Sequence, residues 1–569
     1  MLSKPNDIND LFLDYSIEDL DTMRLRRFLC AVFLTLVFLI VGKLMYNDTN
    51  EENNTTQFKW LAYHEQLRQV IHSTDVRILN SKSSTDFTSL DRNTLTSAKH
   101  TRVQLITGQD QIVTGNYVDF LVTTFDRQNK SRNVGGDFWF ATLHDRQHLY
   151  STSGRITDLN NGSYLIRFYL GCVGDMVMDL TLVYTAEALY WIRQVYRPDE
   201  YTFLWWGIYK TDDKEIEKQE CRVKRGRLFE SKCEYGRGRK GMGDTVFVCD
   251  KPLRHRCDEL KSIESDENTN AISKPVDRLL NKFNFTEYFK SPFYNEKVPL
   301  LINLNVQKSI PNERTTPLPR TPCRIGFRPQ LSSNGYWEYG KWKSLECKTK
   351  TWSTSDINAA LTGHEVHIIG DSTVKQWYVS LNTRLGRRNL GDISRMHFKQ
   401  IYSNFAIQFH YNRLPVSLGK RVPIKHVMEQ FEPELIDGLP GHSNCKYLII
   451  LGHWAHYGAW TEPTYRDHMF YIKEAIVRLM NRCSDVKVAI RSSHPRDHKI
   501  FQTRVQSNHW VFWDMNRIIR ELYAGVRVHF IDVWDLALSY PSAHDVHMPT
   551  ECVNEMVDLL MSHVFYKMV

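Results

Sequence analysis

Hydrophobic residues follow two different spacings along this chain, and the change in spacing separates two parts of it. Between about residues 102 and 202, short runs rich in β-branched and aromatic residues recur between turn signals, namely VQLI, YVDFLVTTF, DFWFATL, SYLIRFYL and MVMDLTLVY. Runs of this length and spacing predict an antiparallel β-sandwich. We therefore expect an all-β domain at residues 101–257, which ends in a basic tail containing four cysteines.

The C-terminal part, residues 322–569, alternates strand patterns with helix patterns. Apolar strands are predicted at 447–451, 486–490 and 526–531, and helices at 465–480, 510–522 and 552–565. This alternation predicts an α/β domain, with a doubly wound parallel sheet and helices on both faces. Residues 258–321, which begin with an acidic patch and end in IPNERTTPLPRTP, are predicted to form a linker.

The N-terminal region contains one long apolar run, at residues 28–46, in which Lys43 is the only charged residue. A run of this length predicts a transmembrane helix that acts as a signal anchor. Arginines precede the run and few basic residues follow it closely, so residues 1–27 are expected to form a cytosolic tail. Residues 47–100 would be a polar stalk, and the remaining chain would be lumenal or extracellular, as in a type II membrane protein.

Glycosylation sequons and cysteines agree with this topology. All the sequons lie beyond the apolar run, at Asn47, Asn53, Asn54, Asn129, Asn161 and Asn284. One cysteine, Cys30, lies inside the run, and the other ten of the eleven lie beyond it. An even number of cysteines in an oxidising compartment predicts disulfides, although spacing alone leaves their pairing open.

The overall charge changes this picture little. The 569-residue chain has 73 Lys and Arg against 65 Asp and Glu, a formal net charge of +8. So small an excess gives no support to a nucleic-acid-binding function. Part of it lies in residues 222–240, which could contact an anionic glycan or a membrane surface, or simply form a solvated loop.

The stretch at residues 365–385 predicts a buried strand, a tight turn and a helix. Val366 and Ile368 belong to the strand, Gly370 forms the turn, and Asp371 or Ser372 caps a helix that starts near Thr373. A serine in this position lies at the carboxyl end of a strand and at the positive end of a helix. Both features favour a nucleophile whose reaction creates an oxyanion, although a simple helix cap is the alternative.

Sites in doubly wound sheets lie beyond the carboxyl ends of the strands, so the residues that follow the other strands are candidates for the same site. Gly452 and His453 follow one strand, and Asp532 and Asp535 follow another, while His547 precedes the final helix. A nucleophilic serine needs a general base, for which histidine is the usual residue. We therefore predict that Ser372 and His547 form the catalytic pair. The histidines in GHWAH and SSHPRDH are interpreted as loop or packing residues, so no metal site is predicted.

These residues resemble a known family. GDS at 370–372 followed by TVKQW, GHW at 452–454 and the late histidine resemble the PC-esterase branch of the GDSL/SGNH hydrolase superfamily, and Cys323 through GYWEYGKW resembles the entry into that domain. The β-domain and its cysteine tail are similar to neurexophilin, with a turn before Tyr164 that is typical of immunoglobulin-like sandwiches. The order of the parts, from about residue 102 to the C-terminus, resembles the NXPE family of neurexophilin and PC-esterase domain proteins.

The resemblance implies transfer or hydrolysis of an O-acyl group, usually acetyl, on carbohydrate. Family members have been linked to O-acetylation of sialic acid, which implies a glycan or glycoprotein acceptor, acetyl-CoA as a candidate donor, no bound cofactor and a Golgi location. Ser372 would take the acyl group and His547 would be the base. The amides of Ser372 and Gly452, beside His453, would bind the oxyanion.

The chain departs from the superfamily pattern at the acid of the triad. An aspartate usually lies three residues before the histidine, whereas this chain has His544 there. Asp545 is the nearest candidate acid, with Asp532 and Asp535 as alternatives. Two other hypotheses for function therefore stay open, namely an inactive glycan- or receptor-binding protein that uses its neurexophilin-like domain, and a carbohydrate O-acetyl esterase.

Overall fold

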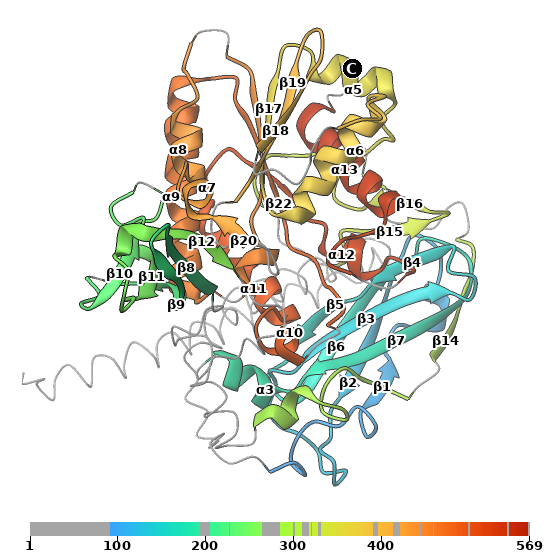
Figure 1. Cartoon of the computed structure of the whole chain (residues 1–569). Helices are drawn as coiled ribbons and strands as arrows, with labels where there is room; N and C mark the ends of the chain where they lie inside the picture. The colour runs from blue at the N-terminus through green and yellow to red at the C-terminus, as the bar shows by residue number, and fades with distance from the viewer. Residues whose placement is uncertain are drawn as a thin grey trace, which may run out of the picture. The chain divides into compact units, whose positions relative to one another are not determined.

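The computed structural model in Figure 1 describes a large part of this chain. The described residues are 91–193, 205–226, 228–239, 241–264, 285–299, 302–309, 318–319, 321–327, 332–390, 397–412, 421–442, 445–458, 460–498, 501–542 and 545–566. No helix in these ranges is long and apolar enough to cross a membrane. The predicted transmembrane helix at 28–46 lies outside them, as do Cys30 and the sequons at Asn47, Asn53, Asn54 and Asn284.

A β-sandwich of two antiparallel sheets follows residues 91–100, the end of the predicted stalk. One sheet has the order β1 (Arg102–Leu105), β2 (Tyr117–Thr123), β6 (Ser163–Tyr169), β5 (Arg155–Asp158). The other has the order β13 (Glu296–Lys297), β7 (Gly174–Tyr184), β3 (Phe138–Asp145), β4 (Tyr150–Ser153), β15 (Gly335–Glu338), β16 (Lys341–Ser344), and β14 (Ile302–Val306) also pairs with β7. Alternate residues of the two sheets, such as Phe120 in β2 and Leu143 in β3, are buried in one shared core. Leu95 and Ala98 of the predicted stalk are also buried.

The cysteine-bearing tail forms a third, separate antiparallel sheet. Its order is β10 (Lys232–Tyr235), β11 (Thr245–Asp250), β9 (Lys214–Arg225), β8 (Trp205–Thr211), β12 (Leu260–Glu264), β20 (Arg421–Pro423). Disulfides join Cys221 to Cys249 and Cys233 to Cys257, and two more join Cys323 to Cys347 and Cys445 to Cys483. The prediction of disulfides is thereby confirmed, while Cys172 and Cys552 are free thiols.

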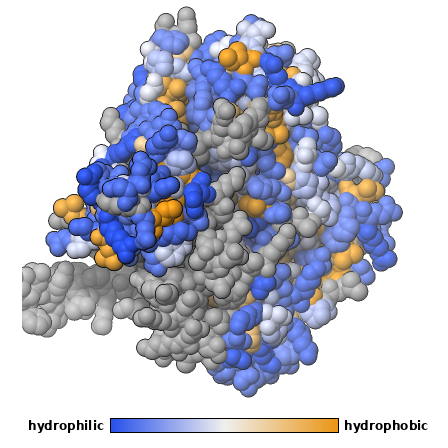
Figure 2. All heavy atoms as spheres, viewed as in Figure 1, coloured by the Kyte–Doolittle hydropathy of each residue, from blue (hydrophilic) through white to orange (hydrophobic). Residues whose placement is uncertain are grey.

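Basic side chains of the stretch at 222–240 are engaged in ion pairs rather than gathered into a free cationic patch. Arg225 pairs with Asp467, Arg239 with Glu434 and Lys232 with Asp250. The visible surface around β8–β11 is largely hydrophilic with separate hydrophobic spots (Figure 2). The pairs of Arg225 and Arg239 join the third sheet to the C-terminal part of the chain.

The segment expected as a linker, residues 258–321, instead contributes three strands to the sheets. β12 pairs with β8, and β13 and β14 both pair with β7. The GYWEYGKW motif, expected at the entry of the C-terminal domain, forms β15 and β16 at the edge of the sandwich. These strands are two to five residues long, and apart from the pairing of β15 with β16 their partners lie far away in sequence, so local spacing does not reveal them.

The C-terminal part contains the predicted parallel sheet. Its order is β18 (His397–Ile401), β19 (Ala406–Tyr411), β17 (Glu365–Gly370), β21 (Tyr447–Gly452), β22 (Lys487–Arg491), β23 (His529–Ile531), and all pairs are parallel except β18 with β19. The chain passes from β17 outward to β19 and then returns to β21 on the other side of β17. The carboxyl ends of β17 and β21 therefore flank the topological switch point, where ligands bind in such sheets.

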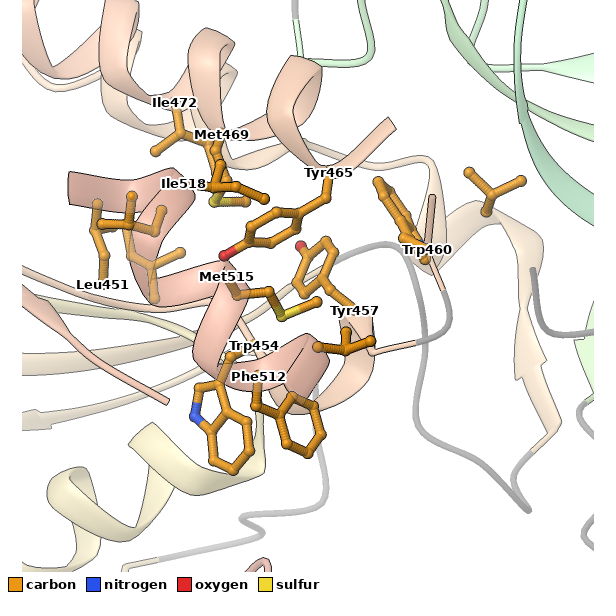
Figure 3. Packing of buried hydrophobic residues seen from close by; sticks show 14 of the residues in the cluster. Leu451, Trp454, Tyr457, Trp460, Tyr465, Met469, Ile472, Phe512, Met515 and Ile518 are labelled. Atoms are coloured by element: carbon orange, nitrogen blue, oxygen red, sulfur yellow. The ribbon is translucent and has the colours of Figure 1, made fainter. Parts of the chain in front are cut away.

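Helices cover both faces of this sheet (Figure 1). The helices of this part of the chain are α5 (Thr354–Leu361), α6 (Ser372–Arg384), α7 (Ile424–Val427), α8 (Glu432–Asp437), α9 (Glu462–Arg482), α10 (Phe501–Val505), α11 (His509–Leu522), α12 (Trp534–Leu538) and α13 (Thr550–Phe565). Alternate residues of β21 point to opposite faces, with Ile450 packed in the cluster of α6 and α13, and Leu451 in the cluster of α9 and α11. Figure 3 shows the second cluster, in which Tyr465 and Met515 lie side by side.

Candidate active site

The GDS turn places Ser372 at the N-terminus of α6. Gly370 has a φ of +151°, and a Cβ atom there would lie 2.0 Å from the carbonyl oxygen of Gly452, so only glycine fits between β17 and β21. Asp371 is the N-cap, and its carboxylate accepts a hydrogen bond of 2.8 Å from the amide of Thr373. Ser372 is half-buried and is the first residue of the helix, at its electropositive end.

The carboxylate of Asp371 also connects this turn to the loop after β21. It is fully buried, and its Oδ2 atom accepts hydrogen bonds from the amides of Trp454 (3.2 Å) and Ala455 (2.7 Å). Burial disfavours its charged form, but the positive charge of His456 and the hydrogen bonds from Thr373 hold the pKa of Asp371 below its ordinary value. A buried, charged carboxylate therefore holds the two loops of the switch point together.

The structure brings Ser372 and His547 into contact across 175 residues of sequence. Nε2 of His547 lies 2.8 Å from the hydroxyl oxygen of Ser372. His547 is exposed, but its surroundings still desolvate the ring, and this desolvation lowers the pKa of His547; the charges of Asp371 and Asp545 oppose the shift. The ring is therefore a neutral base at near-neutral pH, within reach of the serine proton.

The candidate acids lie in three different environments. Asp545 is exposed, and its Oδ1 atom accepts a hydrogen bond of 2.6 Å from the amide of Val546. Its charge acts to raise the pKa of His547. Asp532 forms an ion pair with Arg520 at 2.5 Å. Asp535 accepts from the amide of Asn334 at 2.9 Å, and burial raises the pKa of this carboxyl to about 6. Asp532 and Asp535 thus have partners in other parts of the fold, and they stay alternatives to Asp545 as the acid.

Gly452 and His453 were predicted to help bind the oxyanion, but in the structure both have other roles. The carbonyl of Gly452 accepts from the amide of Asp371 at 3.0 Å, and in a parallel ladder such a residue also directs its own N–H toward the same strand. A Cβ atom on Gly452 would lie 2.6 Å from that of Val374, so this glycine permits close packing of α6 on β21. The ring of His453 is buried near Tyr457, and burial lowers the pKa of His453 to about 4. The amide of Ser372 is the remaining predicted donor.

Several site residues could not be identified from the sequence patterns. His494, in the loop after β22, was expected only to have a loop or packing role, yet it contacts both Arg491 and the backbone of Asp545. Gln376, one turn into α6, donates a hydrogen bond of 2.8 Å to the carbonyl of Met548. Gln376 lies in TVKQW and His494 in SSHPRDH, and both segments follow strands of the parallel sheet, but neither pattern indicates the backbone carbonyl that the side chain contacts.

Two other predictions concern glycosylation sites and metal binding. Asn129 and Asn161 are exposed, and the side chain of Asn161 accepts from the amide of Ser163 at 3.0 Å. Among the residues that the structure describes, one group could supply three metal ligands, namely Cys323, Cys347 and His563. Its two cysteines are joined in a disulfide, so neither is a thiolate that could bind a metal.

Comparison with known proteins finds one family model that matches the C-terminal part. Residues 342–564, which include both Ser372 and His547, match the family model described as "NXPE family member 4-like, C-terminal domain". Among solved structures, the chain is similar to Est24, a carbohydrate acetylesterase from Sinorhizobium meliloti, with 12% sequence identity and a TM-score of 0.23. That similarity covers 35% of this chain and 96% of the other, and so low a TM-score supports no inference about function.

Proposed function

Because this chain belongs to the NXPE family through its C-terminal domain, we propose that it is a serine-dependent O-acyltransferase acting on carbohydrate. The observation that supports this proposal best is the 2.8 Å contact between Ser372 and His547 at the switch point of the parallel sheet. The contact joins a nucleophile at a helix N-terminus to a neutral general base, which is the arrangement that acyl transfer through a covalent intermediate needs.

In the first half-reaction, the oxygen of Ser372 attacks the carbonyl carbon of the acyl donor while Nε2 of His547 takes the serine proton. Negative charge develops on the carbonyl oxygen, and the amide of Ser372 at the start of α6 stabilises it. The bond to the leaving group then breaks, His547 returns its proton to that group, and the acyl group remains on Ser372. The nearby charges of Asp371 and Asp545 stabilise the imidazolium that forms in between.

In the second half-reaction, His547 removes a proton from a hydroxyl of the acceptor, and that oxygen attacks the acyl-serine. Collapse of the second tetrahedral intermediate frees the serine and returns the proton to it. An acetyl group is the acyl group we propose, acetyl-CoA the donor, and a glycan such as one bearing sialic acid the acceptor. Water in place of the sugar would make the same site an esterase.

The setting of this reaction is also part of the proposal. The chain would be anchored by its apolar run at 28–46 in the Golgi or another secretory membrane, with the site in the lumen. Four disulfides in the described residues are compatible with an oxidising compartment.

Intact-mass analysis of the full-length protein after brief exposure to an activated acetyl ester tests the proposed nucleophile. We expect one acetyl adduct on the wild type, mapped to Ser372 and absent from Ser372→Ala. Ser380→Ala is the matched control, because Ser380 lies in the same helix and its hydroxyl donates to Asn554 rather than to His547. Folded wild type without an adduct would favour the binding-protein hypothesis.

The fate of the acetyl group on Ser372, which can pass to a sugar or to water, then distinguishes transfer from hydrolysis. The acetylated protein is mixed with a sialylated glycan or with buffer alone, and the fate of the acetyl group is followed by mass spectrometry. Faster deacylation with glycan and acetyl recovered on sugar would support the transferase. Equal rates and free acetate would instead support the esterase.

A further inference from the structure

Two side chains anchor the short segment that carries His547, one on each side of that residue. Nε2 of His494 lies 3.4 Å from the carbonyl oxygen of Asp545, two residues before His547. Nε2 of Gln376 lies 2.8 Å from the carbonyl oxygen of Met548, one residue after it. Asp545 and His547 are themselves exposed, while Val546 and Met548 pack against the hydrophobic clusters, so the two hydrogen bonds act on a segment that is only partly held by packing.

The hydrogen bonds of His494 fix the direction in which its ring donates. Nη2 of Arg491 lies 2.7 Å from Nδ1 of His494, and a guanidinium can only donate, so Nδ1 accepts. The proton of the neutral ring must then be on Nε2, which faces the carbonyl of Asp545. The ring is fully buried and packs edge-on against Trp454 at 4.6 Å, which leaves it little freedom to turn.

Arg491 connects this ring to the rigid sheet. It is the last residue of β22, and its Nη1 atom donates to the carbonyl of Ser492 at 2.8 Å. Its guanidinium carbon lies 5.6 Å from the ring centre of Trp377 and 5.5 Å from that of Trp454. Burial lowers the pKa of Arg491 to about 10, so the group stays charged at neutral pH. His494 is therefore held by the end of β22 rather than by the segment that carries His547.

We propose that His494 and Gln376 are positioning residues that together hold His547 against Ser372. This inference rests on the proposed function. The two residues fix the backbone around the base, whereas the carboxylate of a Ser-His-Asp triad fixes the ring itself. A base must stay within hydrogen-bond reach of the serine proton, so loss of either anchor reduces the fraction of molecules that can react.

Four variants of the full-length protein test this role. His494→Leu and Gln376→Leu remove the donors, and His494→Gln retains one acceptor for Arg491 and one donor for Asp545. Thr354→Val is the control, because it removes a 2.9 Å hydrogen bond from a side chain to the carbonyl of Arg384, away from His547. We expect acylation of Ser372 to slow about tenfold in both leucine variants and to stay near the wild-type rate in the other two.

A second measurement follows His547 directly and needs no acyl transfer. Diethyl pyrocarbonate modifies only the neutral imidazole, so its rate of reaction at His547, mapped by mass spectrometry against pH, gives the pKa of that ring. In both leucine variants we expect this pKa to rise toward its ordinary value, because a released ring loses the surroundings that desolvate it. Asp371, Asp545, Lys375 and Arg496 are the charged groups that act on the ring in all variants.

The outcomes separate the two proposals. A wild type that forms no adduct at Ser372 contradicts the proposed function, while the titration of His547 still tests the anchors. If the wild type is acylated, and folded Gln376→Leu and His494→Leu proteins retain both its rate and its His547 titration, then the positioning role is wrong. Gln376 is only half-buried, so its variant is expected to fold even if His494→Leu does not.

Discussion

At the scale of single residues, the protonation of His547 determines when the site can react. The base must be neutral, and desolvation lowers the pKa of this ring below the ordinary histidine value of about 6.5. A lowered pKa means that the neutral form persists as the pH falls. We therefore expect the acylation rate of Ser372 to be half-maximal below pH about 6.5, as measured by intact mass at a series of pH values.

The charge of Lys375 helps to set the pH at which the acylation rate is half-maximal. It opposes protonation of His547, so its removal should raise the pKa of the ring and move the half-maximal rate to higher pH. Lys375→Met makes this change, and Lys375→Arg is the control that keeps the charge. If folded Lys375→Met has the same pH of half-maximal acylation as the wild type, then this charge does not act on His547.

At the scale of elements, Asp371 joins the start of α6 to the loop after β21. Its two carboxylate oxygens accept from Thr373 on one side and from Trp454 and Ala455 on the other. In Asp371→Asn only one oxygen remains, so buried amide donors lose their acceptor. We expect a loss of about 2–4 kcal/mol in the free energy of unfolding, measured by chemical denaturation at neutral pH.

The pH dependence of this loss gives a further check on the same variant. Because the pKa of Asp371 is lowered in the folded protein, its contribution is present above the unfolded pKa of about 3.9 and is lost as the pH falls below it. The difference in free energy of unfolding between Asp371→Asn and the wild type should therefore become smaller at acidic pH. Asp356→Asn is the control, since that carboxylate belongs to the capping box of α5 at the surface, and its loss should lower the free energy of unfolding less than Asp371→Asn does. Equal losses for the two variants would contradict the assigned role of Asp371.

Local patterns in the sequence could predict some of these elements but not their long-range partners. The runs around β2 and β3 and the strand, turn and helix at Ser372 depend on neighbouring residues, so spacing predicted them. β14 contains five residues and pairs with β7 more than a hundred residues earlier, which no local spacing encodes. For the same reason the contact between His494 and Asp545, 51 residues apart, had no sequence signal.

The acid of the triad is also hard to predict from the sequence, because its identity depends on long-range contacts. Asp532 follows a strand, as a catalytic acid would, and this position makes it an alternative acid. Its partner, Arg520, lies on the neighbouring α11, and the ion pair between them depends on how that helix packs. Position in the sequence places a carboxylate at the correct end of a sheet, but only tertiary packing decides which partner it meets.

At the scale of the whole described region, the sandwich and the parallel sheet are joined by shared elements. β15 and β16 lie at the edge of the sandwich, and the residue before them, Asn334, donates through its backbone amide to Asp535 at the start of α12. β20, from the C-terminal part, completes the sheet of the cysteine-bearing tail by pairing with β12. The ring of Phe140 in β3 also contacts the ring of His509 in α11, with centroids 4.9 Å apart.

These contacts predict that the sandwich and the active site lose their structure together. Leu143→Ala, which opens a cavity in the sandwich core, should cost about 2–5 kcal/mol, and it should lower the temperature at which Ser372 stops being acylated. Far-ultraviolet circular dichroism measured on the same samples should show the same midpoint, because one cooperative transition moves all probes equally. Leu149→Ala is the control, since that side chain is 42% exposed in the same sandwich. A lowered dichroism midpoint with an unchanged temperature limit for acylation would show instead that the parallel sheet folds independently of the sandwich.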